Sequence, residues 1–593
     1  MLNIALQGLY ESEKINYTGT DEMNSTDLKT WNVKKIGVIG AGIVGVPMAA
    51  LLAHAKIQIG SEQPARVVLI QRNSSTSGWK VDAINSGRSP IGGIEPELDQ
   101  ILSDAVTRGL LRASHNYKEI QDADVILVCV QTDKKHFEPD YGPLFDALKN
   151  LVIVLEDKPK EKMPLIIFES TLAPSSMSTL IKDYFERAGL VEGRDILLGN
   201  SPNRVMPGRL VERIAHSDKV IGGLSRITTE RIKMLYDKIV TKGTLHCTNS
   251  ITAEIIKTLE NAYRDVRIAY SAEIVRYCDL HDIDFYKVRD WVNNRLSKSD
   301  TASGSPNTVP TGAILIPTIG VGGHCLPKDG ILLLWRMIES RMDKSKSLIF
   351  EARRINDESP DATIHLAEQY FGKLDGKFIA LLGAAYRFNS DDTRNSPTFI
   401  LAEHLLEKGC EVAIHDPYVK LSDQNLTRYN LHQYFTQDIS QAVDQAEYLI
   451  FCTAHQIYFE EKENAIRAAT QLRGIIDGCN LFQRSDFEGS QFLYTGIGRG
   501  NKPPDQGFLD FVLKGFRIVE RGVANEIQSL VNFFNDHYAF DEFNRVAFNE
   551  IQRIAGTCVT GCVISDPGPI TTKPDCQEFS SRLINCAIAK STL

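Results

Sequence analysis

The sequence lacks a long apolar run, and it lacks an excess of positive charge. No stretch stays apolar over the roughly 20 residues that a membrane-spanning helix needs, so we expect no such helix. Lys and Arg number 66 against 75 Asp and Glu, and the formal net charge is −9. This balance argues against a nucleic-acid-binding protein, which normally needs a basic face. Residues 1–35 are polar and lack the apolar core of a signal peptide.

The 11 cysteines do not form a disulfide framework. They are scattered through an acidic chain of 593 residues, whereas secreted disulfide-bonded domains are short and dense in cysteine. Cys558 and Cys562, with Cys576 and Cys586 beyond them, match the spacing of no standard zinc ligand pair, so we predict no metal site. We therefore expect a protein of the reducing cytoplasm.

Two stretches of the chain alternate short apolar strands with helices. The first predicts strands at 36–39, 67–70, 125–130 and 165–168, with a helix at 46–55. The second predicts strands at 378–382, 411–414, 448–452 and 474–476, with a helix at 397–408. This alternation is typical of parallel sheets covered by helices. The predicted fold class is therefore α/β, with two Rossmann-like, doubly wound domains.

The segment between these two domains has a different pattern. A helical pattern over 250–280 predicts one long central helix that joins them. Residues 297–312 are rich in Ser, Thr, Gly and Pro, which predicts a loop that could act as a lid. Beyond residue 501 we expect one amphipathic stretch, at 526–554.

A glycine-rich turn follows the first predicted strand. Gly40, Gly42 and Gly45 lie between that strand and the first helix, with Ile43 and Val44 inside the turn. In this context the first two glycines permit a tight turn and a close approach of a pyrophosphate, and the helix N-terminus stabilises the phosphate charge. The turn therefore predicts a dinucleotide-binding site.

The end of the second strand lacks the acidic residue that usually binds the adenosine ribose. Gln71 and Arg72 stand there instead. Gln71 can still bond a ribose hydroxyl, while Arg72 could stack on adenine or favour a 2′-phosphate. We predict NAD rather than NADP.

One cysteine stands in a glycine-rich segment, with Gly320 and Gly322 before Cys325 and with Lys328 and Asp329 after it. The glycines let a substrate approach the backbone closely. A nearby cation lowers the pKa of a thiol and stabilises the nucleophilic thiolate. The alternative is a small buried thiol, as most free cysteines are.

Two further groups of polar residues are candidates for the site. Lys257, Asn261 and Arg264 share one face of the central helix. Such a stripe is usually a solvated surface, but the apolar residues that follow it favour a pocket wall where a lysine stabilises an oxyanion. Residues 169–171 (Glu-Ser-Thr) follow a strand end, where α/β sheets bind ligands, although they could instead cap the next helix.

Several motifs occur together in a fixed order. The segments are Gly40 to Gly45, Glu169 to Thr171, Ser201 to Gly208, Glu254 to Asp265, Gly320 to Asp329, Gly383 to Pro397, Asp416-Pro417 and Thr453 to His455. With these motifs the chain resembles the UDP-glucose/GDP-mannose 6-dehydrogenase family over roughly residues 34–500.

The resemblance implies an oxidation of the C6 alcohol of a nucleotide sugar to a carboxylate, by four electrons and with two NAD. Cys325 would hold the aldehyde as a thiohemiacetal, which is oxidised to a thioester and then hydrolysed. Lys257 and Asn261 would stabilise the oxyanion, and Thr171 and Asp329 would order the attacking water and the thiol.

The resemblance also implies contacts with the two ligands. The residues that would contact the cofactor are Gly40, Gly42, Ile43, Val44, Gly45, Arg72, Thr132, Glu169, Lys328 and Arg394. The residues that would contact the substrate are Asn203, Arg204, Arg264, Gly320, Gly322, Tyr386 and Arg387.

Three positions depart from the family pattern. Asn203 stands where the family has a glutamate, and an amide cannot act as a base at neutral pH, so thioester hydrolysis is the step in question. Arg387 replaces a lysine, and Cys479 stands where an arginine is common. His324 and the segment 261–265 resemble the branch that acts on UDP-N-acetylhexosamines, whereas Lys328-Asp329 is more typical of the UDP-glucose and GDP-mannose branches.

These observations predict a cytoplasmic NAD-dependent nucleotide-sugar 6-dehydrogenase, with UDP-N-acetylglucosamine or UDP-N-acetylmannosamine as the substrate. By resemblance the long central helix, in a helical dimerisation domain, mediates formation of a homodimer or a higher homo-oligomer. The predicted divisions are 1–33 (polar leader), 34–245 (NAD-binding), 246–370 (central helical), 371–500 (UDP-sugar-binding) and 501–593 (extension of unassigned role).

Four alternatives remain open. The substrate could be UDP-glucose or GDP-mannose, or the enzyme could stop at the aldehyde because Asn203 lacks a carboxylate. An inactive sugar-nucleotide binder is disfavoured by the joint presence of Cys325, Lys257 and Asn261. A β-hydroxyacid dehydrogenase shares the fold of the first half but needs neither the thiol nor a second α/β domain.

Overall fold

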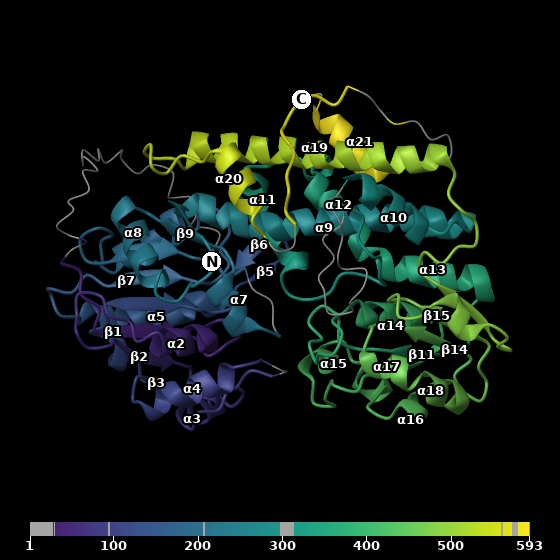
Figure 1. Cartoon of the computed structure of the whole chain (residues 1–593), viewed down its shortest axis with the longest axis horizontal. Helices are drawn as coiled ribbons and strands as arrows, with labels where there is room; N and C mark the ends of the chain where they lie inside the picture. The colour runs from purple at the N-terminus through teal and green to yellow at the C-terminus, as the bar shows by residue number, and fades with distance from the viewer. Residues whose placement is uncertain are drawn as a thin grey trace, which may run out of the picture.

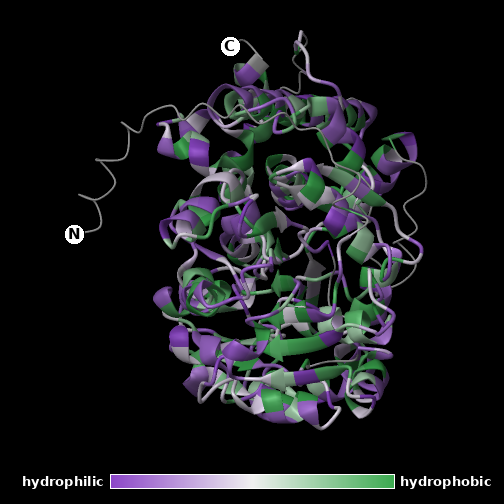
Figure 2. Cartoon of the chain, turned by 90° about the vertical axis from the view of Figure 1, so that its left-hand side faces the viewer, coloured by the Kyte–Doolittle hydropathy of each residue, from purple (hydrophilic) through white to green (hydrophobic). Residues whose placement is uncertain are grey.

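The computed structural model describes residues 28, 30–92, 95–204, 208–296, 313–558, 561–571, 574 and 579–591. Figure 1 shows two α/β regions side by side, with long helices spanning both of them along one edge. Figure 2 shows hydrophobic residues gathered in the strands and hydrophilic residues on the outward sides of the helices. Among the described residues, no helix combines the length and the hydropathy that crossing a bilayer requires.

The first region is built on an eight-stranded sheet. The strands, in their order across the sheet, are β10 (Leu245–Asn249), β9 (Lys219–Gly223), β8 (Leu197–Asn200), β7 (Leu165–Phe168), β4 (Val125–Val128), β1 (Lys35–Ile39), β2 (Arg66–Ile70) and β3 (Leu111–Ser114). All neighbours are parallel except β8 and β9. Every residue of β4 and β7 is buried, as expected for strands covered on both faces.

Helices cover this sheet, and a small hairpin extends from it. The helices are α2 (Gly45–His54), α3 (Trp79–Asn85), α4 (Leu98–Thr107), α5 (Gly142–Glu156), α6 (Lys182–Arg187), α7 (Leu210–His216) and α8 (Arg226–Tyr236). The hairpin consists of β5 (Asp133–Lys135) and β6 (Glu138–Asp140). The strand order reverses between β1 and β4, which is where such sheets bind ligands at their carboxyl edge.

The second region is a fully parallel six-stranded sheet. Its strands, in order, are β13 (Phe435–Thr436), β12 (Glu411–His415), β11 (Phe378–Leu382), β14 (Tyr448–Phe451), β15 (Gly474–Asp477) and β16 (Leu493–Gly496). Its helices are α14 (Pro397–Glu407), α15 (Gln424–Arg428), α16 (Ile439–Val443), α17 (Gln456–Glu460) and α18 (Lys462–Ala468). The predicted fold class and the predicted strands of both sheets are confirmed.

A helical layer joins the two sheets. It contains α9 (Ser250–His281), α10 (Phe285–Leu296), α11 (Leu326–Glu339), α12 (Leu348–Asp357) and α13 (Ser359–Phe371). The predicted central helix is confirmed as α9, which begins where the Asn249 side chain accepts a hydrogen bond from the Thr252 amide at 2.8 Å. The predicted loop at 297–312 lies outside the described residues.

The C-terminal extension adds α19 (Gln506–His537), α20 (Phe548–Ala555) and α21 (Arg582–Ser591) to this layer. The prediction of one amphipathic stretch at 526–554 is wrong in both bounds. Helix α19 begins much earlier, at the N-cap Asp505, and the chain leaves the helix after His537. The Asn535 side chain exchanges two hydrogen bonds with the backbone of Val546, which fixes a turn between α19 and α20.

Candidate active site

The glycine turn after β1 has the shape that a dinucleotide needs. Gly40 has a φ of +104°, and a Cβ there would lie 2.7 Å from the Cys129 carbonyl oxygen. A Cβ on Gly45 would collide with the Gly40 carbonyl. A Cβ on Gly42, in contrast, would meet nothing within 4 Å. The outer glycines therefore close the turn, and open space for a pyrophosphate lies over Gly42 at the start of α2, so these residues fit NAD.

Gln71 supports this turn from the end of β2. Its Oε1 accepts a hydrogen bond from the Ala41 amide at 2.8 Å, and its Nε2 donates to the Ser77 hydroxyl at 2.9 Å. Arg72 is exposed and lies 3.6 Å from Asp146. The predicted contacts of Gln71 and Arg72 with the ribose and adenine remain predictions.

Glu169 lies at the end of β7 in a buried polar cluster. Its carboxylate accepts hydrogen bonds from Lys219 Nζ at 2.9 Å, from Asn203 Nδ2 and from the Tyr236 hydroxyl. Lys219 balances its charge. Asn203 can donate in this setting, whereas a glutamate at the same position would bring two buried carboxylates together. Sequence reasoning missed Lys219 and Tyr236 because they come from β9 and α8.

Cys325 is exposed and directly precedes α11, whose first turn is tied to the first sheet. The buried Lys328 Nζ donates to the Thr132 carbonyl at 3.1 Å and lies 3.4 Å from Asp329 Oδ1. The Thr132 hydroxyl in turn donates to the Thr171 carbonyl at 2.7 Å. The loops after β4 and β7 are therefore linked to the thiol-bearing end of α11.

The polar face of α9 packs against this end of α11. Asn261 Nδ2 donates to Asp329 Oδ2 at 2.6 Å. Burial lowers the pKa of Lys257, but the negative charges of Asp329 and Cys325 outweigh it and raise that pKa above its ordinary value. Lys257 therefore carries a positive charge beside the thiol. The structure thus brings Lys257, Asn261, Cys325 and Asp329 into one cluster.

The surroundings of Cys325 favour its thiolate. Although the residue as a whole is exposed, its thiol is packed against neighbouring groups, and this burial of the sulfur raises the pKa. The hydrogen bond with His324 and the positive charges of Lys257 and Lys328 outweigh it and lower the pKa below its ordinary value. His324 lies 3.4 Å from Asp133 through Nε2. Burial lowers the pKa of His324, but its bonds with Asp133 and Cys325 outweigh this and raise it. The imidazole thus lies between a carboxylate and the thiol.

This arrangement predicts a pH-dependent reactivity of the thiol. Since the bond with His324 lowers the pKa of Cys325, the variant His324→Asn should move the pH dependence of Cys325 alkylation by iodoacetamide to higher pH. Asp329 has the opposite effect on the thiol, so Asp329→Asn should move it to lower pH. Shifts of the two profiles in the same direction would contradict this account of the thiol.

The second α/β region packs directly on the glycines before Cys325. A Cβ on Gly322 would lie 2.9 Å from Tyr386 Cγ, and one on Gly323 would lie 2.8 Å from its Cζ. The Gly323 amide donates to the Arg394 carbonyl at 2.7 Å. Gly322 and Gly323 therefore provide room for Tyr386. Gly320 packs closely in the same way, since a Cβ there would lie 2.7 Å from Pro397.

The four other predicted arginines occupy different environments. Arg394 forms a two-pronged ion pair with Asp392, and Arg387 lies over the ring of Phe388. Arg204 pairs with Glu260 at 2.6 Å. Burial and the neighbouring Arg267 lower the pKa of Arg264 to about 10.

Cys479, which stands where an arginine is common in the family, is half-buried. Burial and the charge of Asp477 raise the pKa of its thiol well above its ordinary value.

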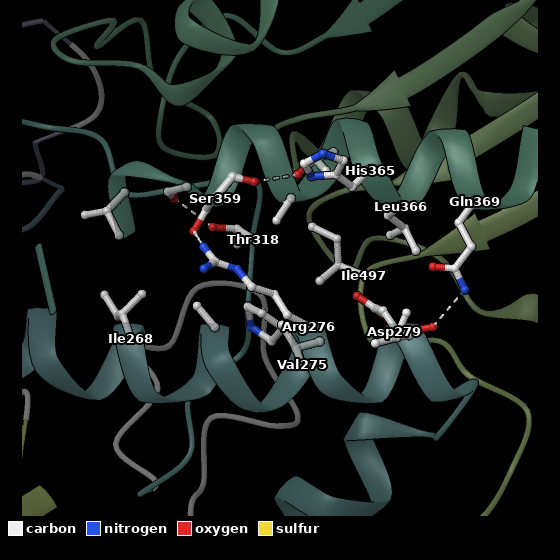
Figure 3. Close-up of a pocket in the computed structure, with 17 residues that line it drawn as sticks. Ile268, Val275, Arg276, Asp279, Thr318, Ser359, His365, Leu366, Gln369 and Ile497 are labelled. Atoms are coloured by element: carbon white, nitrogen blue, oxygen red, sulfur yellow. Dashed lines mark hydrogen bonds between the residues drawn. The ribbon is translucent and has the colours of Figure 1, made fainter. Parts of the chain in front are cut away.

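A pocket of about 250 Å³ lies behind the cysteine segment, between α9, α13 and residues 317–321. Figure 3 shows the Arg276 side chain extending from α9 towards Ser359. Arg276 donates to the Ile355 carbonyl at 2.6 Å and to Ser359 Oγ at 3.2 Å. Of the predicted site residues only Gly320 lines this pocket, so it is separate from the cluster around Cys325. Among the described residues, no group of His, Cys, Asp and Glu could hold a metal ion.

Three family models match the chain. They are the NAD binding domain of the UDP-glucose/GDP-mannose dehydrogenase family at residues 34–240, its central domain at 251–358 and its UDP binding domain at 380–484. All residues after 484 lie beyond these matches.

Similar proteins agree with these matches. A UDP-N-acetyl-D-mannosamine dehydrogenase of Pyrococcus horikoshii is 30% identical over 79% of this chain and 100% of its own length. One from Campylobacter jejuni is 29% identical over 73% of this chain and 98% of its own length. The crystal structure of an NDP-N-acetyl-D-galactosaminuronic acid dehydrogenase from Methanosarcina mazei superposes with a TM-score of 0.65, at 31% identity, over 79% of this chain and 96% of that one.

Proposed function

The chain belongs to the UDP-glucose/GDP-mannose dehydrogenase family and is an NAD-dependent nucleotide-sugar dehydrogenase, and from this premise we propose that it oxidises UDP-N-acetyl-D-mannosamine to the uronic acid. The observation that carries this proposal is Cys325 at the start of α11, whose thiol interacts with both His324 and Lys257. The names of the relatives support the sugar.

The first half of the proposed reaction makes an aldehyde. When bound, NAD accepts a hydride from the sugar C6 in each of two rounds. The C6 hydroxyl gives up its proton to water as the hydride leaves. Lys257 and Asn261 face the thiol from α9, and we assign to them the stabilisation of the negative charge that this leaves on the C6 oxygen. A charged lysine suits this role because its positive charge does not need to form during the reaction.

Cys325 carries the second half. Its thiolate adds to the aldehyde carbon and gives a thiohemiacetal, which becomes a thioester when the carbon loses its second hydride. Water then attacks the thioester carbon, the thiolate leaves, and the carboxylate is released. The carbon loses four electrons in total, and the water supplies the second oxygen of the carboxylate.

The attacking water needs a hydrogen-bond acceptor that orients it and a base that takes its proton. Asp329 Oδ1 lies 3.4 Å from Lys328 and accepts no hydrogen bond from the described residues, so we assign it to the attacking water together with Thr171. Since Asn203 cannot act as a base, we propose that His324, oriented by Asp133, takes the proton of the water.

A panel of nucleotide sugars tests the proposal. With NAD we expect UDP-N-acetyl-D-mannosamine to give two NADH per sugar and a product with the mass of the uronic acid. UDP-N-acetylglucosamine, UDP-glucose and GDP-mannose should react at least about tenfold more slowly, as expected when one substituent contact is lost. One NADH per sugar would indicate an enzyme that stops at the aldehyde, and no NADH with any sugar would overturn the proposed function.

The oligomeric state and the compartment are also proposals. Helix α9, the predicted dimer contact, is covered within the chain by α12, α19 and α20, so we propose that any pairing of two chains uses another surface. Light scattering in solution measures how many chains associate, with 66.2 kDa expected for a single chain. The ten cysteines within the described residues form no disulfide, which supports the cytoplasm.

A further inference from the structure

The C-terminal extension is packed closely onto the central helix. Helix α19 lies alongside α9 (Figure 1), and the Tyr270 hydroxyl on α9 donates to the Val512 carbonyl at 2.9 Å. A Cβ on Gly515 would lie 2.5 Å from that hydroxyl oxygen, and one on Gly522 would lie 2.5 Å from Ala587 on α21. Glycine at these two places therefore lets α19 approach both neighbouring helices.

Two buried carboxylates fix the position of the extension. Glu273 on α9 accepts hydrogen bonds from the Ser581 hydroxyl at 2.7 Å and from the Arg582 amide at 2.6 Å, at the start of α21. Glu526 on α19 accepts one from the Ser347 hydroxyl at 2.6 Å and pairs with Lys590 at 3.1 Å. Because unpaired buried carboxylates are costly, these contacts favour one register of the extension on the helical layer.

The end of α20 reaches the polar face of α9. Arg204, which follows β8, donates to the Ile554 carbonyl at 3.3 Å and to the Thr557 hydroxyl at 3.1 Å. The same guanidinium pairs with Glu260 at 2.6 Å. The Cys558 thiol hydrogen-bonds both members of this ion pair.

This contact lies beside the catalytic face of α9. Glu260 follows Lys257 by three residues and precedes Arg264 by four, so the three side chains share that face. The charges of Glu260 and Cys558 both act on Lys257 and raise its pKa. The extension also receives a hydrogen bond further along α9, from Arg267 to the Gly561 carbonyl at 3.1 Å.

We propose that Thr557 and Cys558 of the extension are positioning residues of the substrate site, which hold the ion pair of Arg204 and Glu260 in the wall beside Lys257. The inference rests on the proposed function, since Arg204 is a predicted substrate contact. The family models end at residue 484, so this part of the wall lies outside the regions that they match. The extension thus acts on binding of the sugar nucleotide rather than on the chemistry at Cys325.

The test compares variants that keep or remove the contact. Thr557→Val removes the hydroxyl that accepts from Arg204, while Thr557→Ser keeps it, and Cys558→Ala removes the thiol. We expect KM for UDP-N-acetyl-D-mannosamine to rise about fivefold to tenfold in the valine and alanine variants, as the loss of one hydrogen bond implies. The serine variant should stay within about twofold of the wild type, kcat should change little, and the pH profile of Cys325 alkylation should not move.

Asn549→Ala is the matched control, because Asn549 is exposed on α20, the helix that ends just before Thr557 and Cys558. Thermal unfolding of each variant detects a loss of folding. Binding of UDP-N-acetyl-D-mannosamine to the wild type, measured by calorimetry, separates the two proposals. No binding would overturn the proposed function and this inference together. Wild-type binding that Thr557→Val and Cys558→Ala leave unchanged would overturn the inference alone.

Discussion

Replacing Cys325 with serine is expected to lower the rate of uronic acid formation by at least about 10³-fold, because a serine hydroxyl stays protonated where the thiol is activated. His324, Lys257 and Lys328 lower the pKa of the thiol, and a hydroxyl, whose ordinary pKa is far higher, would remain neutral among the same groups. Neither the thiohemiacetal nor the thioester can then form. The amount of uronic acid formed under saturating sugar nucleotide, identified by its mass, measures the loss, because the first NADH is formed before the thiol takes part.

A second measurement shows whether the intermediate is covalent. Wild-type protein denatured with acid during turnover should carry the added mass of the sugar nucleotide on the peptide that contains Cys325, and the serine variant should not. Cys247→Ser is the matched control. Cys247 lies half-buried on β10, and burial raises the pKa of its thiol. Full turnover by the Cys325→Ser variant would exclude the covalent mechanism.

The parts of the site that could be predicted from the sequence are those fixed by local geometry. A glycine turn between a strand and a helix has one conformation, so Gly40, Gly42 and Gly45 were predicted in their context. The spacing of Lys257 and Asn261 places them on one helix face whatever packs against it. Both patterns depend on neighbours in the sequence.

The parts that could not be predicted depend on segments that meet only in the folded chain. The cluster around Glu169 takes Lys219 from β9 and Tyr236 from α8, and neither residue belongs to a motif. Asp133 approaches His324 from the hairpin after β4. Glu260 shares the face of Lys257 and Asn261, so helical spacing alone could have identified it as a further candidate.

The contacts of the C-terminal extension were even less predictable from the sequence. Its pattern predicted an amphipathic stretch but gave the wrong bounds, because the break between α19 and α20 comes from the side chain of Asn535 bonding Val546. Nothing in the spacing of Thr557 and Cys558 relates them to Arg204, which lies more than 350 residues earlier. The packing of α19 and α20 on the helical layer brings Thr557 and Cys558 next to Arg204.

Replacing Lys257 with methionine is expected to lower kcat by roughly 10² to 10³-fold, the usual effect of removing one group that stabilises an oxyanion. Methionine fills a similar volume but cannot stabilise negative charge on the C6 oxygen. The positive charge of Lys257 also lowers the pKa of Cys325, so the pH dependence of Cys325 alkylation should move to higher pH in the variant. Stopped-flow detection of the first NADH separates a slow hydride transfer from a slow thioester step.

Two further variants distinguish the charge of Lys257 from its shape. Lys257→Arg keeps the charge but presents a planar fork, so it should restore the alkylation profile of Cys325 while recovering only part of kcat. Lys233→Met removes a partly exposed lysine on α8 that pairs with Asp237 and should leave both measurements unchanged. A Lys257→Met variant with normal kcat would assign the oxyanion to Asn261 alone. A low kcat together with a normal alkylation profile would show that Lys257 stabilises the oxyanion but does not lower the pKa of Cys325. The two roles can be separated in this way because they act on different atoms, the C6 oxygen and the Cys325 sulfur.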